Sequence, residues 1–520
     1  MTSSPQAPGS GLRGSIRALG FVALEPEARS LRTRSVATTL HAVLLALTLA
    51  ACASHSDYTK DARSALDQGR TKDALAQYND ALDVESAKDL PEKIGGDNVL
   101  FILDRAVVLQ ALKDDKLSSR DLEVADKQIE VLDFSRSSVD DIGKYMFSDD
   151  TGPYKAPSYE KLMINTLNMI NYLLRRDLNG ARIEARRLSV MQRHLKDSKG
   201  TREALNTPGS YLAGFIFEKS KQFEEALRYY DEALANGELR SLDDAIVRLA
   251  AQSSYRSPRL NAVLSKHASA TPTAPATTGS AAPSAPPPPA AAATEPARGG
   301  SGEPSRTEPV EPARGEPVEP AEVLVVINYG RVPAKIARRI PIGLALTYAS
   351  GAISPYNQGR ANRLAAQGLV TWVNYPELGE PRGAYGQAFL AIDGQTRALE
   401  QAIAIDQEAK QAWAEVRGSV VASAITRMIT RIIAGEAVNR ASGGDTIGVL
   451  LSLATQATLT ATDTPDTRSW STLPARMAIG RITVAPGTHW VDLEARGRRE
   501  RYKINVKAGD WVVLNLTVLR

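Results

Sequence analysis

The residues best suited to chemistry in this sequence gather in one short segment near its carboxyl end. From Asp463 to Pro474 the chain reads DTPDTRSWSTLP, which brings carboxylates, a guanidinium, an indole and several hydroxyls close together. Asp466 and Arg468 carry the charges of a polar recognition pair, and Trp470 offers a flat apolar surface on which a sugar or a peptide could stack. Loops that concentrate such groups often carry function. Asp466, Arg468 and Trp470 are therefore candidate binding residues.

A structural role explains the same three residues, and we favour it. The segment would then be a tight connector in which Asp466 caps a turn by accepting hydrogen bonds from backbone N–H groups. Arg468 would bind carbonyl oxygens or pair with Asp466, and Trp470 would cover the edge of a sheet. The binding interpretation requires these side chains to be accessible, whereas the connector interpretation does not.

The sequence offers little material for catalysis or for metal binding. It has one cysteine and five histidines, so it lacks the paired cysteines of a disulfide framework or a thiolate metal site. The patterns HExxH, GxSxG, GxxxxGK[ST] and a strand-following GxGxxG are absent. A formal net charge of +4 is too small to indicate nucleic-acid binding. We predict a protein that is not an enzyme, with no catalytic residues, cofactor or metal and no nucleic-acid partner.

The single cysteine ends an apolar run near the amino terminus. A group of arginines between residues 29 and 34 precedes the apolar residues 36–49, and Leu-Ala-Ala comes directly before Cys52. The apolar run is too short to be a comfortable membrane span. This arrangement resembles the lipobox of bacterial lipoproteins, in which the cysteine thiol accepts a diacylglycerol and the leader is removed. The resemblance implies that residues 1–51 are a leader and signal peptide, and that a lipid on Cys52 tethers the protein to a membrane.

The residue after Cys52 bears on which membrane this is. Residue 53 is alanine, whereas an aspartate at this position would resemble an inner-membrane retention signal. The resemblance therefore implies a lipid anchor in the outer membrane with the protein facing the periplasm, and the inner membrane or the cell surface are the alternatives. An ordinary secretory signal with an incidental cysteine, or a signal anchor, would explain the same leader without lipid.

Apolar residues recur at three- and four-residue spacing from residue 56 to 264, which predicts helices. Residues 61–82 and 211–234 carry small and aromatic residues at the same offsets, among them Gly214 and Tyr230, and residues 168–188 carry a weaker copy. The pattern resembles that of tetratricopeptide repeats (TPR), in which pairs of helices stack. We therefore expect residues 52–265 to form a TPR-like helical repeat domain, with an irregular helical bundle as the alternative.

The composition then changes abruptly. From residue 268 to 320 there is no aromatic residue, and alanine, proline, threonine, serine, glutamate and glycine dominate. Such a segment buries too little apolar surface to offset the entropy of ordering it. We predict a disordered linker rich in alanine, proline and glutamate over residues 266–321.

The remainder, residues 322–520, is predicted to be a mixed domain. Apolar β-branched stretches indicate strands in 323–328, 338–346, 368–376 and 387–393, and a helical pattern indicates two helices within about 396–461. Four strands separated by turn residues follow in 479–484, 490–493, 502–506 and 512–519, and we expect them to form a small antiparallel β-sandwich over about 476–520. The predicted fold class is α+β and multidomain.

The order of these features is similar to that of an uncharacterised family of bacterial TPR-containing outer-membrane lipoproteins with a C-terminal β-rich domain. The word DTRSW-x-x-LP and the Pro-Gly-Thr-His turn at residues 486–489 carry the resemblance most specifically. Members of that family are often encoded near lipoprotein activators of peptidoglycan synthases. The resemblance assigns no catalytic residue.

We therefore expect a membrane-tethered cell-envelope lipoprotein that binds or scaffolds proteins, with envelope or peptidoglycan-synthesis assemblies as candidate settings. Its partner would be another envelope protein, held in the concave face of the helical repeats. Arg182, Arg186 and Arg187 share one predicted helix and could meet an acidic partner, although a solvated face explains them too. The alternative function is a glycan- or peptide-binding module, or an unfamiliar envelope enzyme, that uses the loop from Asp466 to Trp470.

Overall fold

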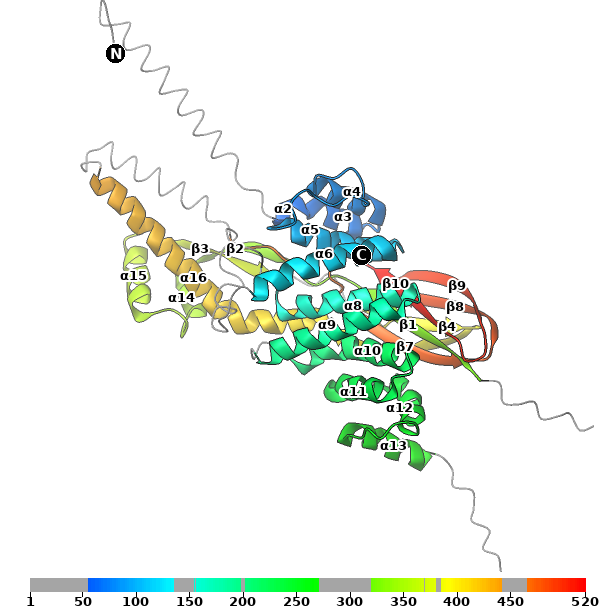
Figure 1. The fold of residues 1–520 in the computed structure, drawn as a ribbon. Helices are drawn as coiled ribbons and strands as arrows, with labels where there is room; N and C mark the ends of the chain where they lie inside the picture. Colours follow the sequence, from blue (N-terminus) through cyan, green and yellow to red (C-terminus); the bar gives the residue numbers. More distant parts are fainter. Residues whose placement is uncertain are drawn as a thin grey trace, which may run out of the picture. The chain divides into compact units, whose positions relative to one another are not determined.

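The chain is helical in its first half and contains both strands and helices in its second half (Figure 1), which confirms the mixed α+β class. The computed structural model describes residues 55–134, 154, 156–197, 202–270, 319–368, 370–379, 385–441 and 465–520. Residues 54–520 form one compact unit. Cys52, the predicted leader, most of the predicted linker and the predicted second helix after residue 445 lie outside the described residues.

Successive helices of the first half pack as pairs. The pairs are α3 (Lys60–Asp67) with α4 (Thr71–Ala81), α5 (Asn98–Ala111) with α6 (Asp115–Phe134), α8 (Ser158–Leu174) with α9 (Leu178–Asp197), α10 (Thr207–Lys219) with α11 (Phe223–Ala233), and α12 (Asp243–Ala250) with α13 (Pro258–Ala270). Short elements complete this region: α2 (His55–Tyr58), η1 (Glu203–Asn206), η2 (Leu234–Asn236) and η3 (Arg240–Leu242).

The same turn joins the two helices in the first four of these pairs. The second residue after the first helix has a positive φ in each case: 74° at Gly69, 66° at Lys113, 59° at Arg176 and 59° at Lys221. In each turn the next N–H group reaches back to the carbonyl five residues earlier, as in the bond from Gln222 to the carbonyl of Phe217. This is the hydrogen bond of a Schellman motif, which satisfies carbonyls at a helix end.

The strands in the described part of the chain form three sheets. The inner sheet has the order β10 (Trp511–Val518), β1 (Ala321–Tyr329), β7 (Arg476–Val484) and β6 (Glu400–Ala404). The outer sheet has the order β5 (Gln395–Ala398), β4 (Phe389–Ile392), β8 (Gly487–Ala495) and β9 (Arg498–Val506). The third is the pair β2 (Lys335–Pro341) and β3 (Trp372–Leu378), which packs with α14 (Ile342–Tyr348), α15 (Pro355–Ala366) and α16 (Ile405–Ala441) around a core of its own.

Strand β1 explains how the layers meet, because all of it is buried. Leu324 and Val326 belong to the same apolar cluster as the helices. Val323, Val325 and Ile327, which alternate with them, belong to the cluster that includes residues of the outer sheet. A strand covered on both faces has this continuous apolar composition.

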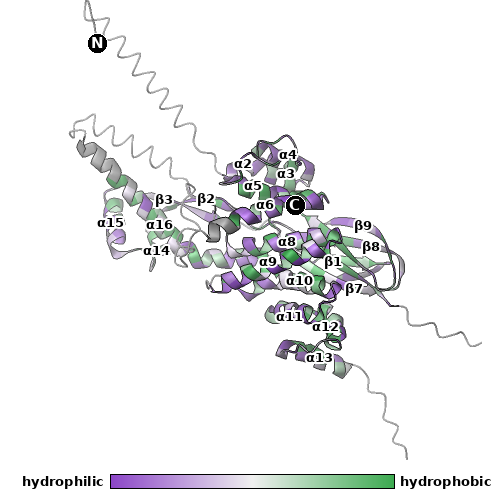
Figure 2. Cartoon of the chain, in the orientation of Figure 1, coloured by the Kyte–Doolittle hydropathy of each residue, from purple (hydrophilic) through white to green (hydrophobic). Residues whose placement is uncertain are grey.

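Three of the paired helices, α5, α8 and α10, lie against the inner sheet, and we call them the inner helices. They contact β10, β10 and β6 respectively. Every residue from Val99 to Ala111 in α5 and from Thr207 to Glu218 in α10 is buried. The partner helix α9 instead buries only one face, and Figure 2 shows hydrophilic and hydrophobic residues mixed along it. The inner helices are thus enclosed between their partner helices and the chain's own sheet.

Several predictions for residues 322–520 were wrong in detail. The predicted strand 338–346 is β2 followed by helix α14, because Pro341 ends the strand and sets the extended backbone from which the helix starts. The short helices α14 and α15 were not predicted, so the expected number of two helices is too low. The helical pattern predicted from residue 396 begins as strands β5 and β6, and α16 starts at Ile405.

The four final strands were predicted correctly, but their arrangement was not. β7 and β10 belong to the inner sheet, and β8 and β9 belong to the outer sheet. β10 pairs with β1 in parallel, so the arrangement is not purely antiparallel. The reason is that β1, which begins where the predicted linker ends, inserts between β10 and β7.

Candidate functional site

The predicted site segment is buried throughout. Every residue from 465 to 475 is buried, and the exposed fractions of Asp466, Arg468 and Trp470 are 3%, 4% and 1%. The segment runs into β7 of the inner sheet and contacts the helices α5 and α8. It therefore lies where the helical half of the chain meets the β-rich half.

Asp466 and Arg468 form the polar pair that their sequence spacing predicted. The Nε atom of Arg468 donates to Oδ1 of Asp466 at 2.9 Å, and Nη2 donates to Oδ2 at 3.0 Å. The backbone N–H of Arg468 also donates to Oδ1 at 3.0 Å, which closes a tight turn. Burial alone would lower the pKa of Arg468, but the carboxylate of Asp466 raises it above its ordinary value. The side chains of Asp466 and Arg468 therefore bind each other inside the protein.

Trp470 points its ring into the core shared with the helices. Its backbone N–H donates to Oε1 of Glu160 on α8 at 3.2 Å. The indole Nε1 atom is buried and has no hydrogen-bond partner among the described residues. As placed, the indole has no exposed face on which a ligand could stack.

Ser471 and Thr472 both bind one carboxylate of the inner helix α5, that of Asp104. Asp104 accepts hydrogen bonds from the backbone N–H of Thr472 at 2.8 Å and from its hydroxyl at 3.0 Å. The Ser471 hydroxyl donates to the other oxygen of Asp104 at 2.9 Å and also lies 3.2 Å from the hydroxyl of Tyr78. His55 Nε2 lies 3.5 Å from the same carboxylate.

Glu160 is a carboxyl group of this region with an unusual acidity. Burial raises its pKa to about 7, although hydrogen bonds from Tyr154 and the backbone of Trp470 and the charge of Lys335 oppose the rise. A carboxyl that titrates near neutrality is a property of general acids and bases. Here its oxygens are engaged by Tyr154 and by Trp470, within a buried contact between α8 and the segment. The arrangement serves packing more readily than catalysis.

The structure thus brings Asp466, Arg468 and Trp470 together, but it turns them inward. Their positions are those of the connector interpretation. Sequence reasoning missed Asp104 and Glu160, which receive this segment. The signal available for Asp104 was a charged pair, Asp104-Arg105, within an otherwise apolar helix. An ionic residue at such a position needs a buried partner.

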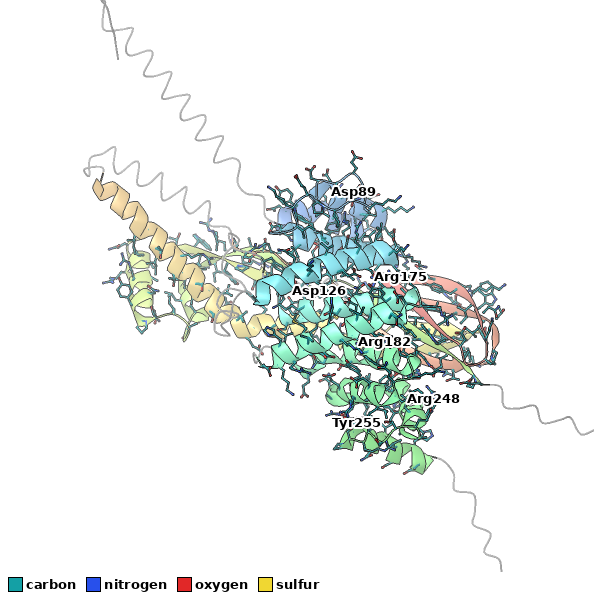
Figure 3. All side chains as sticks on the ribbon, in the orientation of Figure 1. Asp89, Asp126, Arg175, Arg182, Arg248 and Tyr255 are labelled. Atoms are coloured by element: carbon teal, nitrogen blue, oxygen red, sulfur yellow. The ribbon has the colours of Figure 1, made fainter. Side chains whose placement is uncertain are left out.

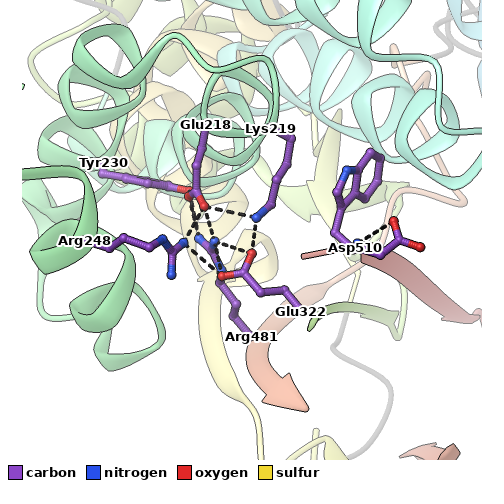
Figure 4. A network of polar contacts seen from close by, with 8 residues as sticks. Glu218, Lys219, Tyr230, Arg248, Glu322, Arg481 and Asp510 are labelled. Atoms are coloured by element: carbon purple, nitrogen blue, oxygen red, sulfur yellow. Dashed lines mark hydrogen bonds and ion pairs between the residues drawn. The ribbon is translucent and has the colours of Figure 1, made fainter. Parts of the chain in front are cut away.

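A second buried polar cluster joins the inner helix α10 to the inner sheet (Figure 4). Arg481 of β7 donates to Glu218 of α10 at 2.5 and 2.9 Å and to Glu322 of β1 at 2.7 and 2.8 Å. Lys219 and Arg248 bind the same two carboxylates. Burial alone would raise the pKa of Glu218 and of Glu322, but these cations lower both below their ordinary values.

Within the described ranges, no group of three or more histidine, cysteine, aspartate or glutamate side chains is arranged to hold a metal ion. None of the helices in those ranges combines the length and the apolar character needed to cross a bilayer.

Comparisons of the chain with known protein families, with curated proteins and with solved structures found no match.

Proposed function

We propose that this chain is a lipid-anchored protein of the bacterial cell envelope that acts as a protein-binding or scaffolding module and not as an enzyme. The leader and Cys52 support the anchor, through their resemblance to a lipobox. The proposed location is the outer membrane, facing the periplasm. The partner is another envelope protein.

The helical half is proposed to be an array of TPR-type repeats. The recurring Schellman turn supports this proposal, and so does the packing of glycine against tyrosine. A Cβ atom on Gly214 would lie 2.4 Å from the ring of Tyr230, and one on Gly180 would lie 2.1 Å from the ring of Tyr172. Small residues at these positions allow a tyrosine of the same pair to pack against the backbone.

The inner and outer sheets are proposed to form a small β-sandwich. Their strands contribute to one apolar cluster, which includes Val325 and Leu516 from the inner sheet and Leu390, Val491 and Ile504 from the outer sheet. Shared burial of this kind is the basis of sandwich packing.

The proposed position of the partner rests on one observation, which is that the chain's own sheet covers the inner helices. Gln110 of α5 accepts a hydrogen bond from Asn328 of β1 at 3.3 Å, and Phe215 of α10 packs edge-on against Trp511 of β10 with ring centroids 5.7 Å apart. The concave face that sequence reasoning assigned to a partner is therefore occupied. We therefore place the partner on the exposed surface of the helices that pair with the inner helices, namely α6, α9 and α11.

Helix α9 offers the most suitable part of that surface. Ile183 and Val190 are 56% and 54% exposed, and their spacing of seven residues places them on one line along the helix. Arg186 and Arg187 lie between them on the same face and are exposed. Arg182, labelled in Figure 3, precedes this stripe on α9. Apolar side chains bordered by arginines suit a partner segment that is both apolar and acidic.

The test is site-specific crosslinking in native membranes. A photoreactive residue replaces Val190, and the same residue at exposed Glu224 of α11 serves as the control. We expect a discrete adduct with one envelope protein from position 190 and none from position 224. Equal adducts from both positions, or none from position 190, would contradict the proposed surface.

The anchor is tested separately with the Cys52→Ala variant. Metabolic labelling should place a fatty acid on the unchanged chain and none on the variant, and the variant should leave the membrane fraction. A labelled or membrane-bound variant would contradict lipid attachment at Cys52. Since the stripe on α9 does not depend on the lipid, the variant should still capture the partner in solution.

A further inference from the structure

A cavity of about 350 Å³ lies beside the buried segment, with Ser471 in its wall. Its other walls come from α3, from the chain that links β1 to β2, from the turn between β8 and β9, and from residue 520. Tyr385 closes one side, and its hydroxyl donates to the carbonyl of Arg331 at 3.0 Å. Gly330, which has a φ of 68°, permits the Tyr385 ring to pack here, because a Cβ atom at that position would lie 2.3 Å from the ring. The volume is in the range of small-molecule sites.

The lining of the cavity is rich in arginine. It includes Arg63, Arg331, Arg496 and Arg520, and Asp67 is the one acidic residue among the described residues that line it. Asp67 forms an ion pair with Arg331. A carboxylate on the main chain of Arg520 would still leave the positive charges in excess. Like charges held close together in a partly enclosed space repel one another unless an anion compensates them.

Two of these arginines are shielded from water to different degrees, Arg331 largely and Arg496 in part. The side chain of Arg331 is 8% exposed, and burial lowers its pKa. The Nε atom of Arg496 is buried and has no hydrogen-bond partner among the described residues, and its guanidinium lies 5.2 Å from the centre of the Tyr385 ring. A buried guanidinium N–H without an acceptor is costly, and it is relieved by an acceptor that enters the cavity.

We propose that this cavity binds the phosphate group of a small organic phosphate. Guanidinium groups bind phosphate oxygens in pairs and with strong, charge-assisted hydrogen bonds. A phosphate monoester carries nearly two negative charges, which match the excess of arginine better than a carboxylate does. A phosphate alone is much smaller than the cavity, so the remaining space accommodates an organic substituent beside Val332 and Ile336.

The experiment uses the full chain in a non-ionic detergent and titrates it calorimetrically with glycerol 3-phosphate, with inorganic phosphate and with glycerol. We expect saturable binding of glycerol 3-phosphate, weaker binding of inorganic phosphate and no binding of glycerol. Arg496→Gln should weaken the binding of glycerol 3-phosphate about tenfold or more, since it removes a charge-assisted contact. The matched control is Arg498→Gln, two residues away, which lies outside the cavity lining and should leave the affinity unchanged.

The melting temperature of each variant shows that it has folded. Arg63→Gln on α3 provides a second test away from the β8–β9 turn, and it should also weaken the binding of glycerol 3-phosphate. Vesicles that contain phosphatidic acid, a lipid with a phosphate monoester headgroup, identify the source of the phosphate: competition with glycerol 3-phosphate would assign the site to a lipid headgroup, and no competition would assign it to a soluble phosphate. Failure of the folded chain to bind glycerol 3-phosphate, or an equal loss of affinity in Arg498→Gln, would overturn the proposal.

Discussion

Asp104 on the inner helix α5 accepts hydrogen bonds from both the backbone N–H and the hydroxyl of Thr472, a residue 368 positions later in the chain. This contact fixes the end of the predicted site segment to the helical half of the protein. Both residues are completely buried. It is therefore a point at which the two halves depend on each other.

Removing this carboxylate should destabilise the whole compact unit. Asp104→Ala leaves a buried N–H group of Thr472 without its acceptor, and we expect the free energy of unfolding to fall by about 2 to 4 kcal/mol. Asp73→Ala on α4 is the control, because its ion pair with Arg70 lies at the surface and should contribute no more than about 0.5 kcal/mol. Urea unfolding followed by circular dichroism measures both. Similar losses in the two variants would refute the proposed contact.

The glycine–tyrosine packing of the helix pairs makes a second prediction. Gly214→Ala places a methyl group against the ring of Tyr230, and the resulting overpacking should destabilise the protein by about 1 to 3 kcal/mol. Gly359→Ala in α15 is the opposite case, because nothing lies within 4 Å of the added atom. Alanine favours helix at that position, so we expect a gain of about 0.5 to 1 kcal/mol. Thermal unfolding should therefore show shifts of opposite sign, and a tolerated Gly214→Ala would argue against this packing.

The cluster around Arg481 should be sensitive to loss of its cation. Arg481→Met leaves Glu218 and Glu322 buried close to each other with less compensation, and we expect a loss of about 3 to 5 kcal/mol. Arg499→Met on β9 is the control, since that side chain is 57% exposed and its ion pair with Asp492 should contribute no more than about 1 kcal/mol.

Acid should reduce the difference between the Arg481→Met variant and the unchanged protein. The folded pKa values of Glu218 and Glu322 lie below the unfolded value of 4.5, so their stabilisation is complete above pH 4.5 and is lost as the pH falls through the folded values. The variant keeps only the part of this stabilisation that Lys219 and Arg248 provide. Chemical unfolding at pH 7 and at pH 3 should show a smaller difference at pH 3, and a constant difference would contradict the electrostatic account.

Glu160 predicts a pH dependence of the opposite sign. Its folded pKa of about 7 exceeds the unfolded value of 4.5, so between these values the folded protein holds a proton that the unfolded chain has released. The contribution of Glu160 to stability is therefore lost as the pH rises through this window, by up to about 3 kcal/mol. Glu160→Gln should flatten the stability profile from pH 4.5 to 7, whereas Glu494→Gln at an exposed position of β8 should not. An unchanged slope in Glu160→Gln would show that another group titrates.

The parts of the fold that follow from local pattern were predictable. The helices from α3 to α11 show apolar residues at helical spacing, and the final strands alternate apolar and polar residues between clear turns. The strands β5 and β6 were not predictable in the same way, because residues 395–404 have a helical composition. Their pairing with β4 and β7 overrides that local preference.

For the candidate site, the residue types were predictable but their orientation was not. The spacing of Asp466 and Arg468 indicated a pair, and the structure contains it. The orientation of Trp470 depends on contacts with residues far away in the sequence. One of them is the hydrogen bond from its backbone N–H to Glu160, which is 310 positions away, and no local pattern reveals this contact. In the same way, the sheet that covers the inner helices comes from the other half of the chain, so the helical pattern alone indicated an open concave face.

The most direct test of the central claim, that the chain's own β-rich half covers its helical half, is zero-length carbodiimide crosslinking of the full chain followed by mass spectrometry. Lys113, next to α5, forms an ion pair with Glu500 of β9, and Lys266 of α13 forms one with Glu238 inside the helical half. We predict intramolecular isopeptide bonds at both pairs. A bond at Lys266–Glu238 without one at Lys113–Glu500 would contradict the account, because it would show reactive, folded helices whose inner face is not covered by the chain's own sheet.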